Sequence, residues 1–295
     1  MKKTAFIAIV GRPNVGKSTL LNAILGEKIA IVSSKPQTTR NRITGIYTKA
    51  DEQYVFLDTP GIHSPKNSLG EYMVRAADTS MKEADAVVLV VDAGKEISSV
   101  EQNVIDYLKR SKIPAILALN KIDTYDREVL AQTISKYAEK HSFEAFVPIS
   151  AKKSKNVDEL MQECAKFLEE SEWFFPEDMV TDQPERQIAA EIIREKILRT
   201  LNKEIPHGTA VVIEEFKDED TLIRIRAEIF CEKASHKGII VGKGGAALKL
   251  IGTYAREDLE KLFGTKVYLN LWVKVKENWR ESAKTVSNFG YRDED

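Results

Sequence analysis

The chain has 295 residues, of which 43% are hydrophobic and 30% are charged, and its formal net charge is −1. This composition is typical of a globular protein and excludes a disordered or collagen-like chain, while the length favours two domains over a single core. No apolar run reaches the roughly 18 residues that a transmembrane helix needs. The two cysteines, Cys164 and Cys231, lie far apart in the sequence. This spacing argues against a disulfide framework or a zinc site and favours reduced thiols in a cytoplasmic protein.

The first part of the chain, up to residue 172, alternates short apolar runs with helical patterns. Strands are predicted at Ala5–Val10, Tyr54–Asp58, Ala86–Asp92, Ala115–Asn120 and Ala145–Ile149. Helices are predicted at 16–25, 69–82, 101–110, 127–141 and 157–168. Continuous apolar runs such as AVVLVVD suit parallel strands that are covered on both faces. Residues 1–172 are therefore predicted to form a doubly wound α/β domain that binds its ligand at the carboxyl ends of the strands.

The alternation stops at residues 171–185, SEWFFPEDMVTDQPE, which contain two prolines and five acidic residues. We interpret residues 173–185 as a linker whose aromatic residues Trp173, Phe174 and Phe175 pack between two domains. Residues 186–295 follow a different order. Helices are predicted at 186–201, 234–240, 246–262 and from residue 278 onward, and strands at 209–216, 221–230 and 266–275. This α-β-β-α-α-β order with one further helix predicts a smaller α+β domain.

A phosphate-binding loop is predicted at GRPNVGKS, residues 11–18, which fits the template G-x-x-x-x-G-K-[ST] between a strand and a helix. Glycines let the backbone N–H groups wrap around phosphates, and the following helix N-terminus adds partial positive charge. Lys17 is expected to reach the outer phosphates and Ser18 to bind Mg²⁺. The residues predicted to bind the phosphates are Gly11, Asn14, Val15, Gly16, Lys17, Ser18 and Thr19.

Three further motifs complete a guanine nucleotide site. In DTPG, Asp58 is expected to hold a magnesium-bound water, while the Gly61 N–H contacts the γ-phosphate. In NKID, residues 120–123, the Asp123 carboxylate can accept two hydrogen bonds from a guanine edge, which adenine cannot supply. Asn120 would brace this loop, and the Lys121 stem would lie along the ring. In SAK, Ser150 and Ala151 follow the last strand, and the Ala151 N–H would donate to the guanine carbonyl oxygen.

The glycine-rich stretch GKGG, residues 242–245, is predicted to form a turn between two helices of the second domain. Such a turn lets the backbone approach a nucleic-acid strand, as in KH domains, which clamp about four nucleotides. The window 233–284 carries 11 basic against 5 acidic residues, which suits a polyanion. With the element order, these features predict a type II KH domain. The residues expected to contact RNA are Lys237, Gly242, Lys243, Gly244, Gly245 and Lys249.

Residues 266–275 alternate aliphatic side chains with Tyr268, Asn270, Trp272 and Lys274 on the other face of the predicted strand. We interpret this aromatic stripe as packing, not as a platform on which bases stack. Ile239, Ile240 and Leu250 are expected to line the core or the nucleic-acid groove.

The motifs GRPNVGKS, TTR, DTPG, NKID and SAK follow one another in this order. The ordered set resembles the translation-linked GTPases of the TrmE–Era–EngA group, and with the C-terminal part included the resemblance covers essentially the whole chain. It implies GTP hydrolysis and makes QTTRN, residues 37–41, the first switch. The hydroxyl of Thr39, or as runner-up that of Thr38, would close on Mg²⁺ there. The metal ligands implied are Ser18, Thr39 and Asp58.

The resemblance also implies partners. They are GTP and GDP, 16S ribosomal RNA near its 3′ end, and the 30S ribosomal subunit during its assembly, with GTP hydrolysis switching the RNA-binding state. Peripheral association with the inner face of the cell membrane is implied as well, and we expect a monomer. The alternative is a signalling or membrane-associated GTPase whose C-terminal module docks protein or lipid. A metabolic ATP-dependent kinase is disfavoured by NKID.

Ile62 stands directly after DTPG, where many nucleotide switches have a glutamine that orients the attacking water. Because positioning and charge neutralisation supply most of the acceleration, its absence predicts a slow GTPase that ions or a partner accelerate. In similar GTPases an asparagine at the position of Asn14 holds K⁺; the sequence leaves open whether Asn14 does so or only caps the loop. His63 is interpreted as a surface turn residue and not as a general base. The groups expected to act in catalysis are Lys17, Thr39, Gly61 and Asn14.

Overall fold

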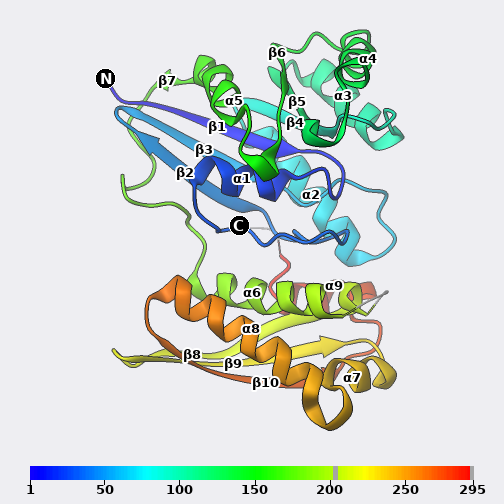
Figure 1. Cartoon of the computed structure of the whole chain (residues 1–295), viewed down its shortest axis with the longest axis vertical. Coiled ribbons are helices and arrows are strands. Elements are labelled where there is room, and N and C mark those ends of the chain that lie inside the picture. Colours follow the sequence, from blue (N-terminus) through cyan, green and yellow to red (C-terminus); the bar gives the residue numbers. More distant parts are fainter. Residues whose placement is uncertain (202–204, 293–295) are drawn as a thin grey trace. The chain divides into compact units, whose positions relative to one another are not determined.

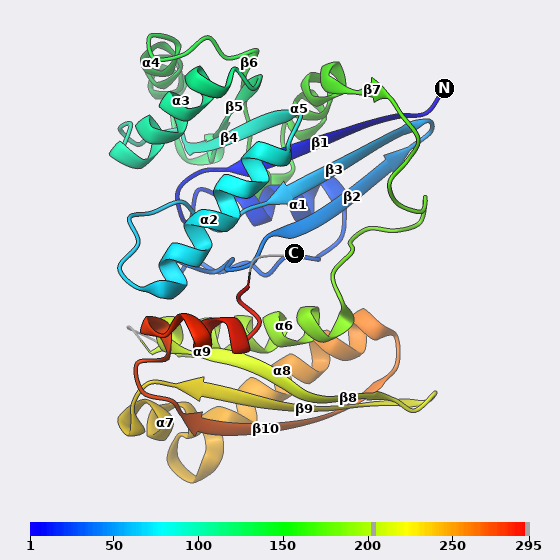
Figure 2. The same cartoon turned by 180° about the vertical axis from the view of Figure 1, so that it is seen from behind.

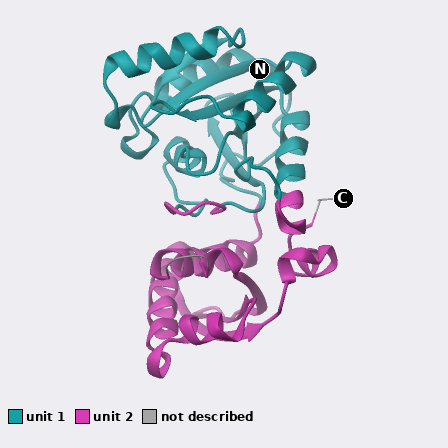
Figure 3. Ribbon diagram, turned by 90° about the vertical axis from the view of Figure 1, so that its right-hand side faces the viewer, with its two compact units in different colours: residues 1–32, 39–65, 73–182 teal, residues 33–38, 66–72, 183–295 magenta. Residues whose placement is uncertain are grey.

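The structure is a computed structural model that describes residues 1–201 and 205–292. The chain divides into two compact units (Figure 3). The first unit comprises residues 1–32, 39–65 and 73–182, and the second comprises 33–38, 66–72 and 183–295. In the part of the chain that the structure describes, no helix combines the length and the apolar character needed to cross a membrane.

The first unit is built on a seven-stranded sheet. Its strands are β1 (Lys3–Val10), β2 (Ile43–Lys49), β3 (Glu52–Asp58), β4 (Ala86–Asp92), β5 (Ala115–Asn120), β6 (Ala145–Pro148) and β7 (Glu169–Glu170). The order is β2-β3-β1-β4-β5-β6, and the short β7 pairs with β1. Strands β3, β1, β4, β5 and β6 are parallel, whereas β2 is antiparallel to β3 and β7 is antiparallel to β1. The five predicted strands are confirmed, and their carboxyl ends meet at one edge.

Strand β2 was missed by the sequence analysis. Its sequence, ITGIYTK, has no continuous apolar run, and Gly45 near its centre is a residue that weakens strands. A Cβ atom at Gly45 would lie 2.5 Å from Leu21 Cδ1. The glycine therefore marks the close approach of helix α1 to the strand, which a pattern of hydrophobicity does not reveal.

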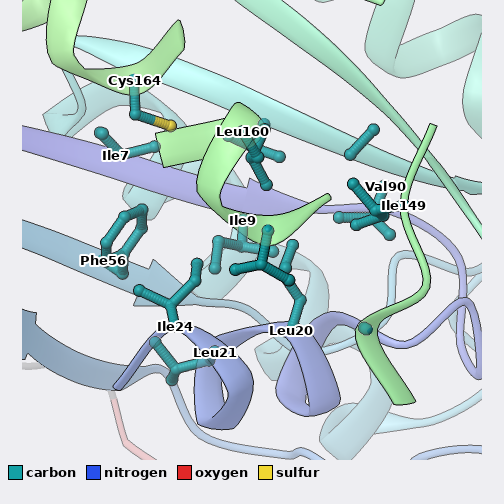
Figure 4. Close-up of a cluster of buried hydrophobic side chains, with 14 of the residues drawn as sticks. Ile7, Ile9, Leu20, Leu21, Ile24, Phe56, Val90, Ile149, Leu160 and Cys164 are labelled. Carbon is teal, nitrogen blue, oxygen red and sulfur yellow. The ribbon is translucent and has the colours of Figure 1, made fainter. Parts of the chain in front are cut away.

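Helices cover both faces of this sheet (Figure 1, Figure 2). They are α1 (Lys17–Leu25), α2 (Ser68–Glu83), α3 (Ser99–Ser111), α4 (Arg127–Ala138) and α5 (Val157–Cys164). Helices α1 and α5 close one core, in which Leu20, Leu160 and the buried thiol of Cys164 pack against Ile7 and Phe56 (Figure 4). The other face packs against α3 and against side chains of α2 and α4. The doubly wound architecture is thus confirmed, with a mixed sheet because β2 and β7 run antiparallel.

The aromatic residues of the predicted linker contact the first unit. The Phe174 ring lies 5.0 Å from the Phe6 ring, edge to face, and the backbone N–H groups of Phe174 and Phe175 donate to Gln53 Oε1. Further along, the Val180 carbonyl accepts a hydrogen bond of 2.9 Å from the Ile46 N–H. The contacts of Phe174 and Phe175 are thus with β1 and β3 of the first unit, and the expectation that the aromatic residues pack between domains stays a prediction.

The second unit is a three-stranded sheet with its two longest helices on one face. Its elements are α6 (Glu185–Thr200), β8 (Ala210–Asp218), β9 (Leu222–Cys231), α7 (Ala234–Val241), α8 (Ala246–Phe263), β10 (Lys266–Val275) and α9 (Ala283–Asn288). The strand order is β10-β9-β8, with β10 parallel and β8 antiparallel to β9. The core between the sheet and helices α6 and α8 includes Ile193, Ile225, Ile251 and the buried Cys231. The predicted α-β-β-α-α-β order is confirmed.

Short single helical turns connect several of these elements. They lie at Ile122–Thr124, Ala151–Lys153, Ala165–Phe167, Pro206–Gly208, Lys243–Gly245 and Trp279–Glu281. The last of them corresponds to the start of the predicted final helix, which begins as α9 at Ala283.

Candidate functional site

The loop between β1 and α1 adopts backbone conformations that need glycine. Gly11 has φ 149° and Gly16 has φ 103°. A Cβ at Gly11 would lie 2.3 Å from the Val90 carbonyl oxygen, and one at Gly16 would lie 2.2 Å from Asn120 Nδ2. The second contact means that the GRPNVGKS loop touches the NKID loop directly. The two motifs that the sequence assigns to phosphate and base therefore form one continuous surface.

Lys17 begins helix α1 and is only 6% exposed. Its ammonium donates to the carbonyl oxygens of Gly11 at 3.1 Å and Arg12 at 3.0 Å. Burial lowers the Lys17 pKa to about 8, and the nearby Asp58 opposes this shift. The side chain is therefore still mainly protonated at neutral pH. On this loop, charged phosphate oxygens would accept its hydrogen bonds more strongly than the two carbonyl oxygens do.

Three oxygen-bearing side chains converge beside Lys17. Ser18 Oγ donates to Asp58 Oδ2 at 2.5 Å and lies 2.7 Å from Thr39 Oγ1. The hydroxyl of Thr38 instead donates to the Lys35 carbonyl at 2.6 Å. The geometry thus brings together the three predicted metal ligands and favours Thr39 over its runner-up.

Asp58 is fully buried at the carboxyl end of β3. Its Oδ1 atom has no hydrogen-bond partner among the described residues. Burial raises the Asp58 pKa to about 6, although Lys17 and the Ser18 hydroxyl lower it. A buried carboxylate oxygen without a donor, next to two hydroxyls, fits a hard divalent cation such as Mg²⁺. Ser18, Thr39 and Asp58 are the residues that would hold it.

The segment after Asp58 packs against the phosphate-binding loop. A Cβ at Gly61 would lie 2.7 Å from the Pro13 backbone, and the Ile62 N–H donates to the Gly11 carbonyl at 3.1 Å. The Ile62 side chain packs against the core under α3. His63 Nδ1 lies 2.9 Å from the Gly61 carbonyl oxygen. Ile62 therefore anchors this turn through its backbone and its apolar side chain. Because that side chain has no hydrogen-bonding group, it cannot orient the attacking water.

Asn120 connects three loops at the end of β5. Its Nδ2 donates to the Val15 carbonyl at 2.7 Å, and its Oδ1 accepts from the N–H groups of Lys121 at 2.8 Å and Ala151 at 2.9 Å. Its role as a brace is therefore visible in the structure. The Ala151 N–H was expected to donate to guanine, and here it donates to Asn120. A guanine carbonyl would have to share this donor.

Asp123 is held by the SAK loop. Ser150 Oγ donates to Asp123 Oδ1 at 2.7 Å, and Lys153 lies 3.9 Å from Oδ2. The hydrogen bond from Ser150, with weaker contributions from the nearby lysines, holds the Asp123 pKa below its ordinary value. Asp123 is thus a charged acceptor at neutral pH, as recognition of the guanine N1–H and amino group requires.

The sequence analysis missed two groups that support the site. Lys121 Nζ donates to Asp92 Oδ2 at 2.8 Å, and Tyr125 donates to the other oxygen of Asp92 at 2.9 Å. Arg12 Nε donates to the fully buried Glu101 at 2.8 Å. Asp92 ends the apolar run AVVLVVD, and Glu101 completes the capping box Ser98-x-x-Glu101 at the start of α3. The sequence around Asp92 and Glu101 indicates a strand end and a helix start. It does not indicate their partners, Lys121 and Arg12, which lie far away in the sequence.

The GKGG turn joins α7 to α8 in the second unit. Gly242, Gly244 and Gly245 have φ angles of 74°, 59° and 83°. A Cβ at Gly244 or Gly245 would meet no atom within 4 Å. The glycines are therefore required by the backbone conformation, and the turn leaves open space beside it. The three lysines predicted to contact RNA, Lys237, Lys243 and Lys249, are all exposed near this turn.

Comparisons with known proteins agree with this geometry. The family model described as "50S ribosome-binding GTPase" matches residues 6–121, and a KH domain model matches residues 204–280. The protein named GTPase Era of Clostridioides difficile (strain 630) is 52% identical over 296 residues, covering 99% of this chain and 100% of that protein. That of Alkaliphilus oremlandii (strain OhILAs) is 54% identical over 291 residues, covering 98% and 99%. This chain belongs to the Era family of GTPases.

Two solved Era structures are similar to this chain over nearly its whole length. Era in complex with MgGDPNP and nucleotides 1506–1542 of 16S ribosomal RNA has a TM-score of 0.95 and 43% identity, covering 99% of both chains. An Aquifex aeolicus Era variant bound to GDP and AlF₄⁻ has a TM-score of 0.94 and 43% identity, covering 98% of this chain and 99% of that one. The chain is therefore a P-loop GTPase with a C-terminal KH domain.

One interpretation made from the sequence is wrong for this Era-family chain. Tyr268 and Trp272 on β10 are 53% and 59% exposed, so they do not pack into the core. The core contacts of β10 come from the alternate residues, such as Val267 and Val273. Of the three aliphatic residues assigned to core or groove, Ile240 is fully buried, whereas Ile239 and Leu250 are exposed.

Proposed function

We propose that this protein hydrolyses GTP and that its nucleotide state controls the binding of its KH domain to 16S ribosomal RNA near the 3′ end, during assembly of the 30S subunit. The observation that carries the hydrolytic part is the convergence of Ser18, Thr39 and Asp58 next to Lys17. The RNA target is supported by the similar Era structure solved with nucleotides 1506–1542 of 16S ribosomal RNA.

In this proposal the first unit acts mainly by positioning and by neutralising charge. Lys17 exchanges its two carbonyl partners for oxygens of the outer phosphates. Ser18, Thr39 and Asp58 hold Mg²⁺, which when bound neutralises charge that develops on the phosphates. The Gly61 N–H contacts the γ-phosphate, and a phosphate oxygen accepts the proton of the attacking water. Since Ile62 is built into the core, hydrolysis by the protein alone is slow.

The first switch supports a link between nucleotide and RNA. Thr39 belongs to the first unit and its hydroxyl lies 2.7 Å from Ser18 Oγ, while the preceding residues 33–38 belong to the second unit. Within the second unit, the buried Arg194 of α6 donates to the Thr38 carbonyl and is paired with Glu191 at 2.5 Å. Movement of Thr39 on nucleotide exchange therefore displaces the adjacent Thr38 carbonyl, to which Arg194 of α6 donates.

Replacement of Arg194 tests this link. In the Arg194→Met variant, the difference in RNA affinity between the GDPNP-bound and GDP-bound states should shrink at least threefold, because the Thr38 carbonyl loses its donor. Arg199→Met on the same helix, where the side chain is half exposed, is the matched control and should retain the difference. If both variants retain it, Arg194 does not carry the coupling.

The RNA assignment is tested by salt-dependent binding. The variant Lys237→Asp/Lys243→Asp should bind a single-stranded RNA of about ten nucleotides more weakly, with a salt slope reduced by at least ~1.4, since each lost phosphate contact removes about 0.7. Crosslinking to ribosomal RNA in the GDPNP and GDP states then identifies the target. Unchanged RNA binding in the variant would favour the alternative function, in which the second unit docks protein or lipid.

Potassium activation is a separate part of the proposal. Asn14 stands in the phosphate-binding loop with φ 64°, where a bound K⁺ would neutralise charge much as an arginine does. Hydrolysis should be faster in K⁺ than in Na⁺ buffer, and Asn14→Ala should abolish the difference while GDP affinity stays within about twofold. Equal turnover in both salts would remove potassium from the mechanism.

We further propose a monomeric, cytoplasmic protein, and we carry over peripheral attachment to the inner membrane surface from the family resemblance. Sedimentation equilibrium tests the monomer, with a mass of 33.2 kDa expected. Flotation with anionic vesicles tests the attachment: a protein that stays at the bottom of the gradient with either nucleotide would contradict it.

A further inference from the structure

The sheet of the second unit has one face covered by α6 and α8 and another that those helices leave open (Figure 2). Along β9, residues Ile223, Ile225 and Ile229 point to the helices, so the alternate residues point to the opposite side. At one end of that side, Phe289 of α9 stacks on Phe230 with ring centroids 4.4 Å apart. We call the remainder of this side the open face.

The open face presents two exposed aromatic rings in one row. Tyr268 and Trp272 lie on β10, 53% and 59% exposed, with Asn270 between them. The strand register places Tyr268 beside Arg224 and Asn270 beside Arg226 of β9. The Arg224 guanidinium lies 5.5 Å from the centre of the Tyr268 ring. Aromatic rings and guanidinium planes are the groups on which unpaired bases stack in RNA-binding proteins.

The charges of the open face also suit a polyanion. Its cationic residues are Lys217, Arg224, Arg226, Lys266 and Lys274, and its acidic residues are Glu215 and Glu228. Each of these carboxylates is paired with a lysine, Glu215 with Lys217 and Glu228 with Lys274. Arg224 is paired at 2.8 Å with Glu219 in the turn before β9, but both side chains are about half exposed, so this pair is weak. The charges of the acidic groups are thus neutralised by the lysines next to them. The arginines beside Tyr268 and Asn270 therefore make the net charge of the open face positive.

The types of apolar residue on the open face favour RNA over a protein as its partner. Except for Leu222, the aliphatic residues in the interior of β9 and β10, such as Ile225 and Val273, point to the helix side. On the open face of these two strands the one aliphatic residue is Leu222, at the start of β9, and the others are aromatic, charged or asparagine. A protein-docking sheet would present aliphatic side chains at the centre of the patch, as the cores of interfaces do. Aromatic rings between guanidinium groups match flat bases with charged backbones.

We propose that the open face is a second single-stranded RNA surface, on which Tyr268 and Trp272 each stack an unpaired base and Arg224 and Arg226 contact the backbone. The inference rests on the proposed RNA binding of the KH domain. Strand β10 is the edge of the sheet, and both α7 and α8, which flank the GKGG turn, pack against it. A strand bound at the turn can therefore continue over the β10 edge to the open face.

The spacing of the rings sets the length of RNA that is required. Tyr268 and Trp272 are four residues apart on one strand, a separation of roughly 13 Å, which leaves room for one or two nucleotides between the stacked bases. The GKGG turn by itself clamps about four nucleotides. An oligonucleotide of six nucleotides should therefore fill the turn only, whereas one of 16 should reach both surfaces.

The test compares these two lengths in the full-length protein with GDPNP and Mg²⁺, using fluorescence anisotropy of unstructured labelled RNA. The wild-type protein should bind the 16-nucleotide RNA at least tenfold more tightly than the six-nucleotide RNA. In Tyr268→Ala/Trp272→Ala this advantage should disappear while affinity for the short RNA stays within twofold. The matched variant Tyr268→Phe/Trp272→Phe keeps two stacking rings and should keep most of the advantage.

The outcomes separate this inference from the proposed function. If the alanine variant keeps the full length advantage, the open face does not bind RNA and the inference is overturned. If the phenylalanine variant loses it as completely as the alanine variant, stacking is not the cause, and the inference is likewise rejected. Failure of the proposed function looks different, because Lys237→Asp/Lys243→Asp would then leave binding of the six-nucleotide RNA unchanged.

Discussion

In the first unit, Asn120 joins three loops through hydrogen bonds to Val15, Lys121 and Ala151. In the second unit, Lys237, Lys243 and Lys249 stand exposed around a glycine turn beside which a side chain would find open space. The nucleotide site is thus held together by hydrogen bonds within the protein, while the proposed RNA surface presents separate contacts. Substitutions in the first should act on several groups at once, and substitutions in the second should act one contact at a time.

The largest effect is expected at Asp123. In Asp123→Asn, the amide presents a donor to the guanine N1–H or amino group, so GTP affinity should fall by about 10²–10³-fold and xanthosine triphosphate should bind better than GTP. Competition against a fluorescent GDP analogue measures both. Ser150→Ala, which removes only the hydrogen bond to Asp123, should weaken GTP severalfold without changing the preference. Equal losses for both nucleotides in Asp123→Asn would show that Asp123 does not read the base.

A pH dependence of stability is expected from Asp58. Its pKa is about 6 in the folded chain against an ordinary value of 3.8, so the folded state binds the proton more tightly. The stability that this provides is complete below pH 3.8 and is lost as the pH rises through 6. The difference in unfolding free energy between wild type and Asp58→Asn should therefore fall by about 3 kcal/mol over this window in metal-free protein.

Urea unfolding with EDTA at several pH values between 4 and 7 measures this dependence. Saturation with Mg²⁺ and GDP should remove it, because a cation beside the carboxylate favours its ionised form. A difference between the two proteins that stays constant from pH 4 to pH 7 would show that Asp58 titrates normally.

A smaller effect is expected at Glu101, which is buried under Arg12 of the phosphate-binding loop. Glu101→Gln leaves the guanidinium with a weaker partner, so stability should fall by about 1–3 kcal/mol and GDP should dissociate several times faster. Glu96→Gln is the matched control, since Glu96 pairs with Lys136 at the surface with both side chains exposed. That pair should contribute less than about 1 kcal/mol. Equal losses of stability in Glu101→Gln and Glu96→Gln would show that the buried ion pair contributes no more than the exposed one.

The smallest effects are expected among the lysines of the second unit. Lys249→Ala should weaken RNA binding less than tenfold and reduce the salt slope by about 0.7, with the unfolding free energy changed by less than about 0.5 kcal/mol. Combined with Lys237→Ala, the losses in binding free energy should add. A double-variant loss that departs from the sum by more than about 1 kcal/mol would indicate that this surface, too, is organised as a unit.

The same contrast explains what the sequence could and could not predict. Except for Thr39, which only the family resemblance assigned, the residues around Lys17 and Asn120 follow from contiguous motifs, because phosphate and purine chemistry demand particular residue types at particular spacings. Asp92 and Glu101 were missed because their partners, Lys121 and Arg12, lie 29 and 89 residues away. Alternation along β10 separated its two faces correctly, but which face the helices cover is decided by tertiary packing.

Each unit has one buried thiol, whose reactivity reports the unfolding of that unit's core. Cys164 lies in the core of the first unit and Cys231 in that of the second, and burial raises the pKa of Cys164 to about 12 and also raises that of Cys231. Alkylating reagents attack thiolates that they can reach, so the native protein should react very slowly. Mass spectrometry of the two cysteine-containing peptides, sampled along a denaturant series, would then time the loss of each core separately within one unmodified chain.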